Sequence, residues 1–152
     1  MIIIIDKQEK KLGVRGYDFK TIKPDPPLTE RAHLKTGDYS IKGLEDKITI
    51  ERKTLTDLFG SVGNGRKRLE AEFQRMKSFD YAAIVIESPL ASIFTNPPGR
   101  SDMKPKSVFR TLIAWSQRYN VHVWPMWNRE AAERVTYLIL KRFYNDYKKG
   151  GK

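Results

Sequence analysis

The stretch GDYSIKGLEDKITIERKTLTD, residues 37–57, carries the strongest structural signal in this chain. Its pattern predicts a β-hairpin, with one strand over residues 39–42, a turn over residues 43–46 and a second strand over residues 47–53. The second strand alternates apolar and polar residues, which places Ile48 and Ile50 on one face. The other elements of the chain are therefore placed relative to this hairpin.

The hairpin brings charged side chains onto one face. A four-residue turn places Asp38 directly opposite Glu51, and strand alternation adds Lys53 to the face of Glu51. Opposed carboxylates repel each other unless a cation such as Mg²⁺ bridges them. Bound to Asp38 and Glu51, the cation would activate water for phosphodiester hydrolysis, and Lys53 would orient that water or stabilise the phosphate. An ordinary hairpin with a charged, solvent-facing side explains the same pattern without chemistry.

Further motifs follow the hairpin in a recognisable order. They are Leu58-Phe59-Gly60-Ser61, then Asn64-Gly65-Arg66, a helical run to Met76 and a strand ending at Glu87. Together with GDY, ERK and Asp57, they resemble the XPF family of structure-selective DNA nucleases, within the PD-(D/E)xK superfamily. The resemblance covers the chain to about Ser88.

The resemblance implies a fold and an activity. The fold would be an α/β nuclease core of the restriction-endonuclease type, with a central mixed β-sheet flanked by helices. The activity would be that of a Mg²⁺- or Mn²⁺-dependent DNA endonuclease that cuts branched DNA or single-strand/double-strand junctions and leaves a 5′-phosphate. The family motif also includes Arg52, which strand alternation points away from Glu51, so we expect Arg52 to support the site through salt bridges.

Length and composition agree with an enzyme that acts on nucleic acid. With 152 residues, the chain is expected to form one nuclease domain over residues 1–152, without a helix-hairpin-helix module. A net charge of +11 favours DNA over a membrane, because the longest apolar run, residues 1–5, is too short to span a bilayer. Without cysteine and with two histidines, any metal would be held by oxygen. An intracellular location, cytoplasmic or nucleoid-associated, is expected.

Two predicted buried strands, residues 1–6 and 80–87, end in an acid. Catalytic groups of open α/β sheets gather at such strand ends, so Asp6 is a candidate site residue, although a strand-ending turn residue is the simpler interpretation. The XPF family carries Asp-x-Arg-Glu here, and this chain has Gln8 in place of the arginine. Any role of that arginine is therefore in doubt.

Two further groups of candidates follow the hairpin. Thr54 and Asp57 fit a helix capping box, and the resemblance places Asp57 at the edge of the active site as well. A flexible glycine-rich link, residues 60–65, then introduces a helix over residues 66–78 with a buried stripe of Leu69, Phe73 and Met76. The basic residues at the start of this helix either contact DNA phosphates or form a solvated face; they are Arg66, Lys67 and Arg68.

The remaining segments are predicted more coarsely. Residues 11–34 read as an irregular connection with a short strand near residues 16–22; its candidate phosphate contacts, or simple surface cations, are Arg15, Lys20 and Lys23. A helix over residues 106–119 and a strand over residues 121–125 precede a final helix, residues 128–147. The predicted inward face of this last helix consists of Ala131, Val135, Leu138, Ile139, Arg142 and Phe143.

Aromatic residues are more abundant near the C-terminus than one small sheet needs, and family members pair through their nuclease domains, so a homodimer is expected. These residues are Trp124, Trp127, Tyr137, Tyr144 and Tyr147. The alternative to an active nuclease is a non-catalytic DNA-binding subunit, since the XPF family contains partners that have lost their acids. Intact Asp38, Glu51 and Lys53 favour activity. Glu70 and Glu72 receive no role from the sequence.

Overall fold

The computed structural model describes residues 1–10 and 16–150, so Arg15 lies outside the described residues. A six-stranded mixed sheet forms the centre of the molecule. In sheet order, the strands are β2 (Leu28–Ala32), β1 (Ile2–Asp6), β3 (Tyr39–Ile41), β4 (Ile48–Lys53), β5 (Tyr81–Ile86) and β6 (His122–Pro125). The β1–β3 and β3–β4 pairs are antiparallel and the others are parallel, which confirms the predicted α/β fold with a central mixed sheet.

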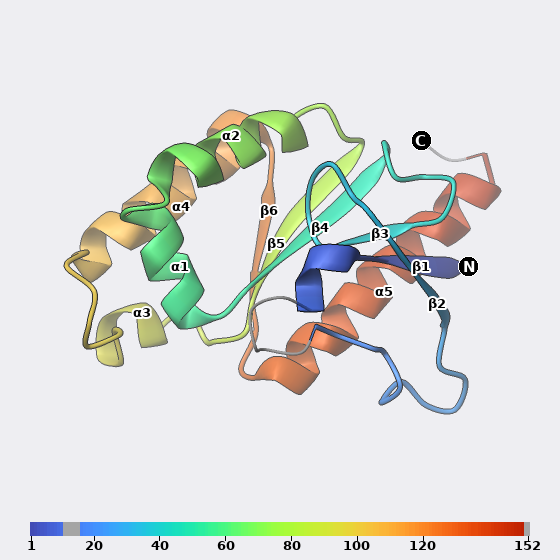
Figure 1. Ribbon diagram of the computed structural model, residues 1–152, viewed down its shortest axis with the longest axis horizontal. Helices are drawn as coiled ribbons and strands as arrows, with labels where there is room; N and C mark the ends of the chain where they lie inside the picture. Colours follow the sequence, from blue (N-terminus) through green and yellow to red (C-terminus); the bar gives the residue numbers. More distant parts are fainter. Residues whose placement is uncertain (11–15, 151–152) are drawn as a thin grey trace.

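Helices cover both faces of the sheet (Figure 1). They are the 3-10 helix η1 (Lys7–Lys10) and the helices α1 (Leu55–Val62), α2 (Arg66–Met76), α3 (Ser92–Thr95), α4 (Pro105–Tyr119) and α5 (Arg129–Lys148). The helices α1, α2 and α4 pack together on one face, and α5 contacts β3, β4 and β5 on the other. Within the described ranges, no helix is long and apolar enough to cross a membrane.

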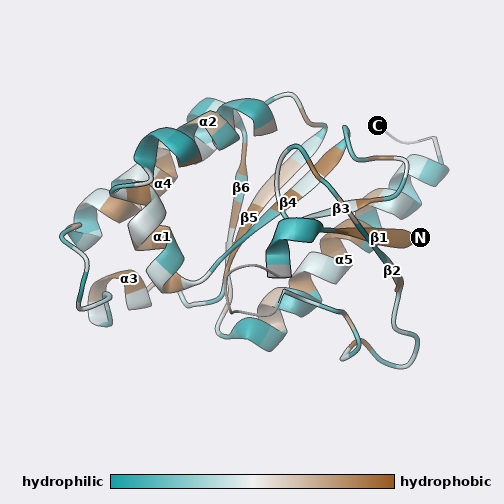
Figure 2. Cartoon of the chain, in the orientation of Figure 1, coloured by the Kyte–Doolittle hydropathy of each residue, from teal (hydrophilic) through white to brown (hydrophobic). Residues whose placement is uncertain are grey.

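Two apolar clusters hold these layers together, and Figure 2 shows the hydrophobic residues concentrated on the strands. Period-two alternation divides β5 between them: Ile84 and Ile86 pack under α1, α2 and α4, whereas Val85 packs under α5. In β4, Ile48 and Ile50 belong to the cluster beneath α5. The intervening residues of β4, which carry the candidate chemistry, therefore point toward α2.

The predicted register of the hairpin is confirmed. Tyr39 pairs with Ile50 in the antiparallel β3–β4 ladder. Continuing this register by one residue places Asp38, which directly precedes β3, opposite Glu51. The backbone N–H of Asp38 donates to the carbonyl of Ile50 at 2.8 Å, which holds Asp38 beside β4. The two acids thus lie opposite each other, as the turn length predicts.

Three details of the prediction are wrong. Residues 16–22 form no strand, since Phe19 has a φ of 58°. The strand within residues 11–34 is instead β2, a polar strand at the edge of the sheet, whose Leu28 is exposed. Gly60 lies inside α1, which continues to Val62. In α5, Leu138 is exposed, and the most deeply buried positions are Ala132, Thr136 and Leu140, because small side chains allow the helix to approach the sheet.

Candidate active site

Asp38 directly precedes β3 and follows a glycine that the backbone requires. Gly37 has a φ of 75°, and a Cβ there would meet the Thr49 Oγ1 at 2.1 Å and the Ile50 carbonyl oxygen at 3.1 Å. The Asp38 Oδ2 accepts a hydrogen bond of 2.8 Å from the backbone N–H of Arg52. Burial, together with the neighbouring Glu51 and Glu9 carboxylates, raises the pKa of Asp38 well above its usual value. Asp38 is thus fixed in position, and its surroundings disfavour the charged carboxylate form.

Glu51 and Lys53 occupy the same face of β4. The Lys53 Nζ lies 2.5 Å from the Glu51 Oε1, and the Glu51 side chain is buried. Burial lowers the pKa of Lys53, but the neighbouring carboxyl groups, Glu51 first and then Glu72 and Asp38, together outweigh that effect, so the pKa of Lys53 lies above its usual value. At neutral pH, Lys53 is therefore an ammonium, which can stabilise a phosphate or orient water but cannot accept a proton.

Arg52 points to the other face of β4, where it forms a buried network. Its Nε donates to the Glu87 Oε1 at 2.6 Å, and its Nη1 lies 3.4 Å from the Glu9 Oε2. The Arg129 Nη1 lies 3.4 Å from the same Glu87 oxygen, and both guanidinium groups lie over the ring of Tyr17. Arg52 thus occupies the supporting place that strand alternation predicts, with Glu87 as its main partner.

Glu9 connects this network to Asp38 and Glu51, whose carboxyl groups form the acidic face. The sequence did not single out Glu9. Its Oε2 accepts a hydrogen bond of 3.0 Å from the Tyr39 hydroxyl, and its carboxyl group contacts that of Asp38. Burial raises the pKa of Glu9 above its usual value, although Arg52 opposes the shift. The sequence shows that Glu9 follows Asp6 by three positions. It does not show that Glu9 approaches Asp38, because that contact depends on the turn that η1 makes after β1.

Glu72 is the second acid without a predicted role, and it reaches the site from α2. Its carboxyl group makes a hydrogen-bond contact with that of Glu51, and its Oε1 accepts a hydrogen bond of 3.3 Å from the backbone N–H of Gly37. Burial, followed by the charge of Glu51, raises the pKa of Glu72 to about 8. The helical periodicity could have indicated this position, because Glu72 lies three residues after Leu69, on the side of α2 that carries its buried residues.

The structure does not bring Asp6 and Asp57 into these contacts. The two carboxylate oxygens of Asp6 accept backbone hydrogen bonds from Gln8 at 3.0 Å and Leu34 at 2.8 Å, so Asp6 organises the chain after β1. The Thr54 hydroxyl accepts from the Asp57 N–H at 3.1 Å and donates to the Asp57 carboxylate at 2.7 Å. Thr54 therefore caps α1 as predicted, and both acids have structural partners.

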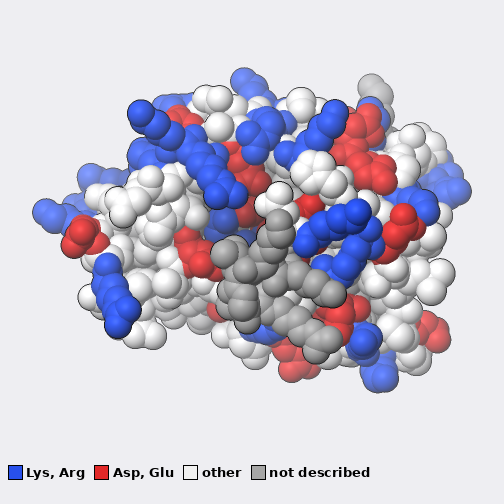
Figure 3. Space-filling model, in the orientation of Figure 1, with Lys and Arg blue, Asp and Glu red and all other residues white. Residues whose placement is uncertain are grey.

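The predicted phosphate contacts on α2 divide into two kinds. All three residues are exposed, but among them only the Arg66 guanidinium has recorded contacts with the described residues: it lies 4.8 Å from the centre of the Trp115 ring and donates to the Thr111 hydroxyl at 3.2 Å. Figure 3 shows Lys and Arg side chains over α2, with acidic side chains below them. One further cation lies close to the site: the Arg75 Nε donates to the Thr36 hydroxyl at 3.0 Å. Lys20 and Lys23 are exposed on the irregular connection.

The acidic face fits a hard divalent cation. Its donors are carboxylate oxygens, which Mg²⁺ and Mn²⁺ prefer. Within residues 1–10 and 16–150, no three His, Cys, Asp or Glu side chains already form a metal-binding group. The acids instead touch in pairs, Glu9 with Asp38 and Glu51 with Glu72. Mg²⁺ commonly uses one or two carboxylates and completes its shell with water and substrate phosphate, so opposed Asp38 and Glu51 suit it.

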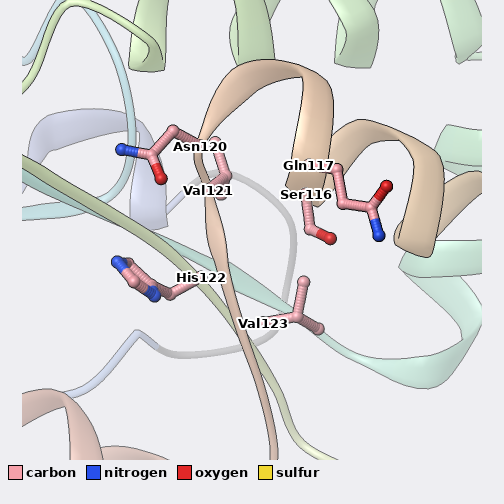
Figure 4. A pocket seen from close by; sticks show the side chains of 6 residues that line it. All are labelled: Ser116, Gln117, Asn120, Val121, His122 and Val123. Atoms are coloured by element: carbon pink, nitrogen blue, oxygen red, sulfur yellow. The ribbon is translucent and has the colours of Figure 1, made fainter.

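The hollow that Figure 4 shows lies apart from this acidic face. Its volume is about 360 Å³, and it lies at the junction of α4 and β6. Its lining residues are Ser116, Gln117, Asn120, Val121, His122 and Val123. The His122 ring stacks on Tyr81 at 4.6 Å, and none of the lining residues contributes an acid. The candidate chemistry therefore rests on the hairpin and α2.

Comparison with known proteins agrees with the fold and the motifs. DNA repair protein rad16 of Schizosaccharomyces pombe is 29% identical over 132 residues, which cover 75% of this chain and 14% of that protein. The chain thus spans about one-seventh of the length of this relative.

Two solved structures share the fold. XPF from Aeropyrum pernix matches with a TM-score of 0.68 and 18% identity over 98% of this chain and 69% of that chain. XPF from Aeropyrum pernix in complex with DNA matches with a TM-score of 0.68 and 19% identity over 95% of this chain and 65% of that chain. The ERCC4 domain model matches residues 5–139, which is most of the sequence. The chain therefore belongs to the ERCC4 domain family, and it is an XPF-family nuclease domain.

Proposed function

We propose that this chain is a Mg²⁺- or Mn²⁺-dependent DNA endonuclease that hydrolyses phosphodiester bonds at branched DNA or at single-strand/double-strand junctions inside the cell. The observation that carries the proposal is the register that sets Asp38 opposite Glu51, with Lys53 on the same face. Family membership and the basic side chains over α2 support DNA as the substrate.

Each residue has a role that follows from its surroundings. Asp38 and Glu51 hold the divalent cation, which when bound supplies charge neutralisation at the phosphate and activates water. Lys53 remains charged at neutral pH, so it orients the water or stabilises the phosphate in the transition state. Arg52 acts as a positioning residue, because its backbone N–H holds Asp38 while its guanidinium holds Glu87.

Asp6 and Asp57 have a supporting role in this proposal. Asp6 fixes the chain on one side of Asp38, and the two residues are linked by a backbone hydrogen bond of 2.8 Å from the Asp6 N–H to the Asp38 carbonyl. Asp57 lies in the first turn of α1, where its backbone N–H donates to the capping Thr54 hydroxyl. Both residues therefore hold the backbone next to the hairpin in place and take no direct part in the reaction.

Binding to DNA is assigned to the outer surface of α2. Lys67 and Arg68 are exposed and contact phosphates. Arg66 packs on the Trp115 ring and so fixes the start of α2 against α4. We also propose a homodimer, since large apolar side chains are exposed toward the C-terminus. These are Trp124, Trp127, Leu138 and Tyr147. Sedimentation equilibrium should give twice the monomer mass, and a monomer at micromolar concentration would contradict the dimer.

A cleavage assay tests the enzymatic proposal. The wild type and the variants D38A and K53A are incubated with labelled linear duplex, single-stranded, flap, fork and four-way DNA, in Mg²⁺, Mn²⁺ or EDTA. The matched control is D46N, which changes an exposed acid in the turn of the same hairpin. We expect metal-dependent cutting of at least one branched substrate by wild type and D46N, and binding without cutting by D38A and K53A.

Two outcomes would change the conclusion. If D38A cuts as fast as wild type, Asp38 does not hold the catalytic cation. If the wild type binds branched DNA but cuts none of the substrates with either metal, the chain acts as a non-catalytic DNA-binding subunit.

A further inference from the structure

Arg75 lies in the last turn of α2, close to the proposed cation site. Its Nε donates to the Thr36 hydroxyl at 3.0 Å, and one turn earlier on α2 the Glu72 Oε1 accepts from the backbone N–H of Gly37 at 3.3 Å. The helix thus contacts the two residues that directly precede Asp38. Arg75 is exposed and Thr36 is buried, so the guanidinium is anchored on the protein and still reaches solvent.

The positive charge of Arg75 is not balanced by an acid. Within the part of the chain that the structure describes, no carboxylate oxygen lies within 4.0 Å of its side-chain nitrogens, and neither Nη group has a hydrogen-bond partner. Arg52 and Arg142 use the same Nε atom to bind a carboxylate, each at 2.6 Å. The hydroxyl of Thr36 holds the Arg75 guanidinium without neutralising it, so its charge remains available to an anion.

Two structural roles explain part of this arrangement. A cation in the last turn of a helix is favoured by the partial negative charge at the helix C-terminus, and the hydrogen bond to Thr36 ties α2 to the segment before β3. A lysine would serve the first role, and a neutral donor would serve the second. Neither role uses the two Nη groups, which form the end of a planar fork that matches two phosphate oxygens.

A DNA strand that follows α2 would meet Arg75 beside the cation site. Arg68 precedes Arg75 by two helical turns, so the two exposed side chains lie on the same side of α2, about 10 Å apart along its axis. Figure 3 shows the basic side chains over α2 with acidic side chains below them. The acids repel a phosphate, and Lys53 is engaged by Glu51 at 2.5 Å. A further cation at this point therefore favours the approach of the strand.

We propose that Arg75 binds a phosphate of the cleaved DNA strand, next to the phosphate that is hydrolysed, through the Nη groups that the Thr36 anchor leaves free. This inference rests on the proposed function, because it adds a substrate contact to the same site. Arg75 would set the position of the strand relative to Asp38 and Glu51. Its loss should therefore affect binding more than the loss of an ordinary surface charge.

DNA binding without cleavage tests the contact. Fork DNA is titrated in EDTA, at several salt concentrations, with the wild type, R75A, R75K, T36V and the control K77A, which removes an exposed cation two residues further on. R75A should bind about 10-fold more weakly and reduce the slope of log K against log salt by about one. R75K should keep the slope but regain only part of the affinity, because lysine lacks the fork. K77A should bind almost as the wild type does.

The anchor and the fold are tested with the same variants. T36V removes the hydroxyl that holds the Nε but no charge, so it should lower the affinity without changing the salt slope. The melting temperatures of R75A and K77A should be similar, because each variant removes one cation near the same helix end. If R75A does not fold, R75K and T36V still test the contact, and wild-type affinity in both would overturn the proposal.

Neutral phosphates locate the contact on the DNA. In each of a set of forks, one phosphate near the junction is replaced by a methylphosphonate, and binding is measured for the wild type and R75A. At the phosphate that Arg75 contacts, the replacement should weaken binding by the wild type and leave R75A unaffected. In the cleavage assay, this phosphate should lie beside the cut bond, on the strand that is cut.

The outcomes separate this contact from the proposed function. If every replacement weakens R75A as much as the wild type, or if R75A and K77A lose equal affinity, Arg75 makes no specific phosphate contact and the inference is overturned. If the wild type cuts no DNA but R75A is still insensitive at one phosphate, the phosphate contact is supported and the nuclease activity is not.

Discussion

Replacing Arg52 by methionine should cost far more stability than the loss of an ordinary ion pair. The Arg52 side chain is 7% exposed, and it joins Glu87 at 2.6 Å to Glu9 at 3.4 Å beneath the hairpin. Methionine fills similar space but leaves both carboxylates without this guanidinium. Breaking a buried pair by removing one partner typically costs about 3–5 kcal/mol, because the remaining charge stays desolvated.

The remaining contacts place the expected loss near the lower limit of that range. Glu87 keeps the Arg129 guanidinium at 3.4 Å, and Glu9 keeps the Tyr39 hydroxyl at 3.0 Å. We therefore expect R52M to lower the free energy of unfolding by about 3 kcal/mol at pH 7.5. The loss should shrink toward pH 5, since removing Arg52 takes away the charge that lowers the folded-state pKa of Glu9, and protonation of Glu9 then relieves its buried charge.

Urea unfolding of the metal-free protein at pH 5.0 and 7.5 checks this expectation. The matched control is R142M, which breaks an exposed pair within α5, where the Arg142 side chain is 81% exposed and the Asp146 side chain is 40% exposed. This control should lose less than about 0.5 kcal/mol. A loss for R52M below about 1 kcal/mol, or one that is the same at both pH values, would show that water screens the network and would refute the reasoning.

Three further predictions concern the cap, the titration of the site and the DNA contacts. T54A should lower the free energy of unfolding by about 1 kcal/mol through loss of the α1 cap, and an unchanged urea midpoint would contradict the assigned cap. The pKa of Glu72, raised from 4.5 to about 8, means that the metal-free folded state holds an extra proton between these values. Thermal stability should therefore decline as pH rises from about 4.5 to 8, less so in E72Q, and parallel profiles would argue against this titration. K67A should reduce the slope of log K against log salt for DNA binding by about one, and an unaltered slope would remove Lys67 from the interface.

The hairpin could be predicted from sequence because its determinants are local. A four-residue turn and period-two alternation fix which residues face each other, and Tyr39 pairs with Ile50 accordingly. The opposite orientations of Arg52 and Lys53 follow from the same alternation. Most other strands and helices also lie where their periodicity places them.

The contacts that complete the site depend on the packing of distant segments, which local patterns do not report. Glu9 meets Arg52 across 43 positions of the chain, and Glu72 meets Gly37 across 35. The face of α5 was predicted only in part: Ala131, Val135, Ile139 and Phe143 face the core, but Leu138 and Arg142 do not. The prediction also missed Glu133, which is buried and accepts from the Phe19 N–H at 2.7 Å and the Thr21 hydroxyl at 2.8 Å. A buried acid in a helix looks like a surface residue until its partner is known.

The position of α5 has a consequence for the order in which the chain is synthesised. The apolar face of β3, β4 and β5 is made early, but α5, which packs on it, is the last helix in the sequence. Until residues 129–148 leave the ribosome, that face is exposed to water and to other chains. A fragment of residues 1–128 should therefore bind a hydrophobic dye strongly and aggregate, and adding the α5 peptide in trans should reduce both effects. A fragment that stays monomeric and dye-free would show that the sheet is protected without its last helix.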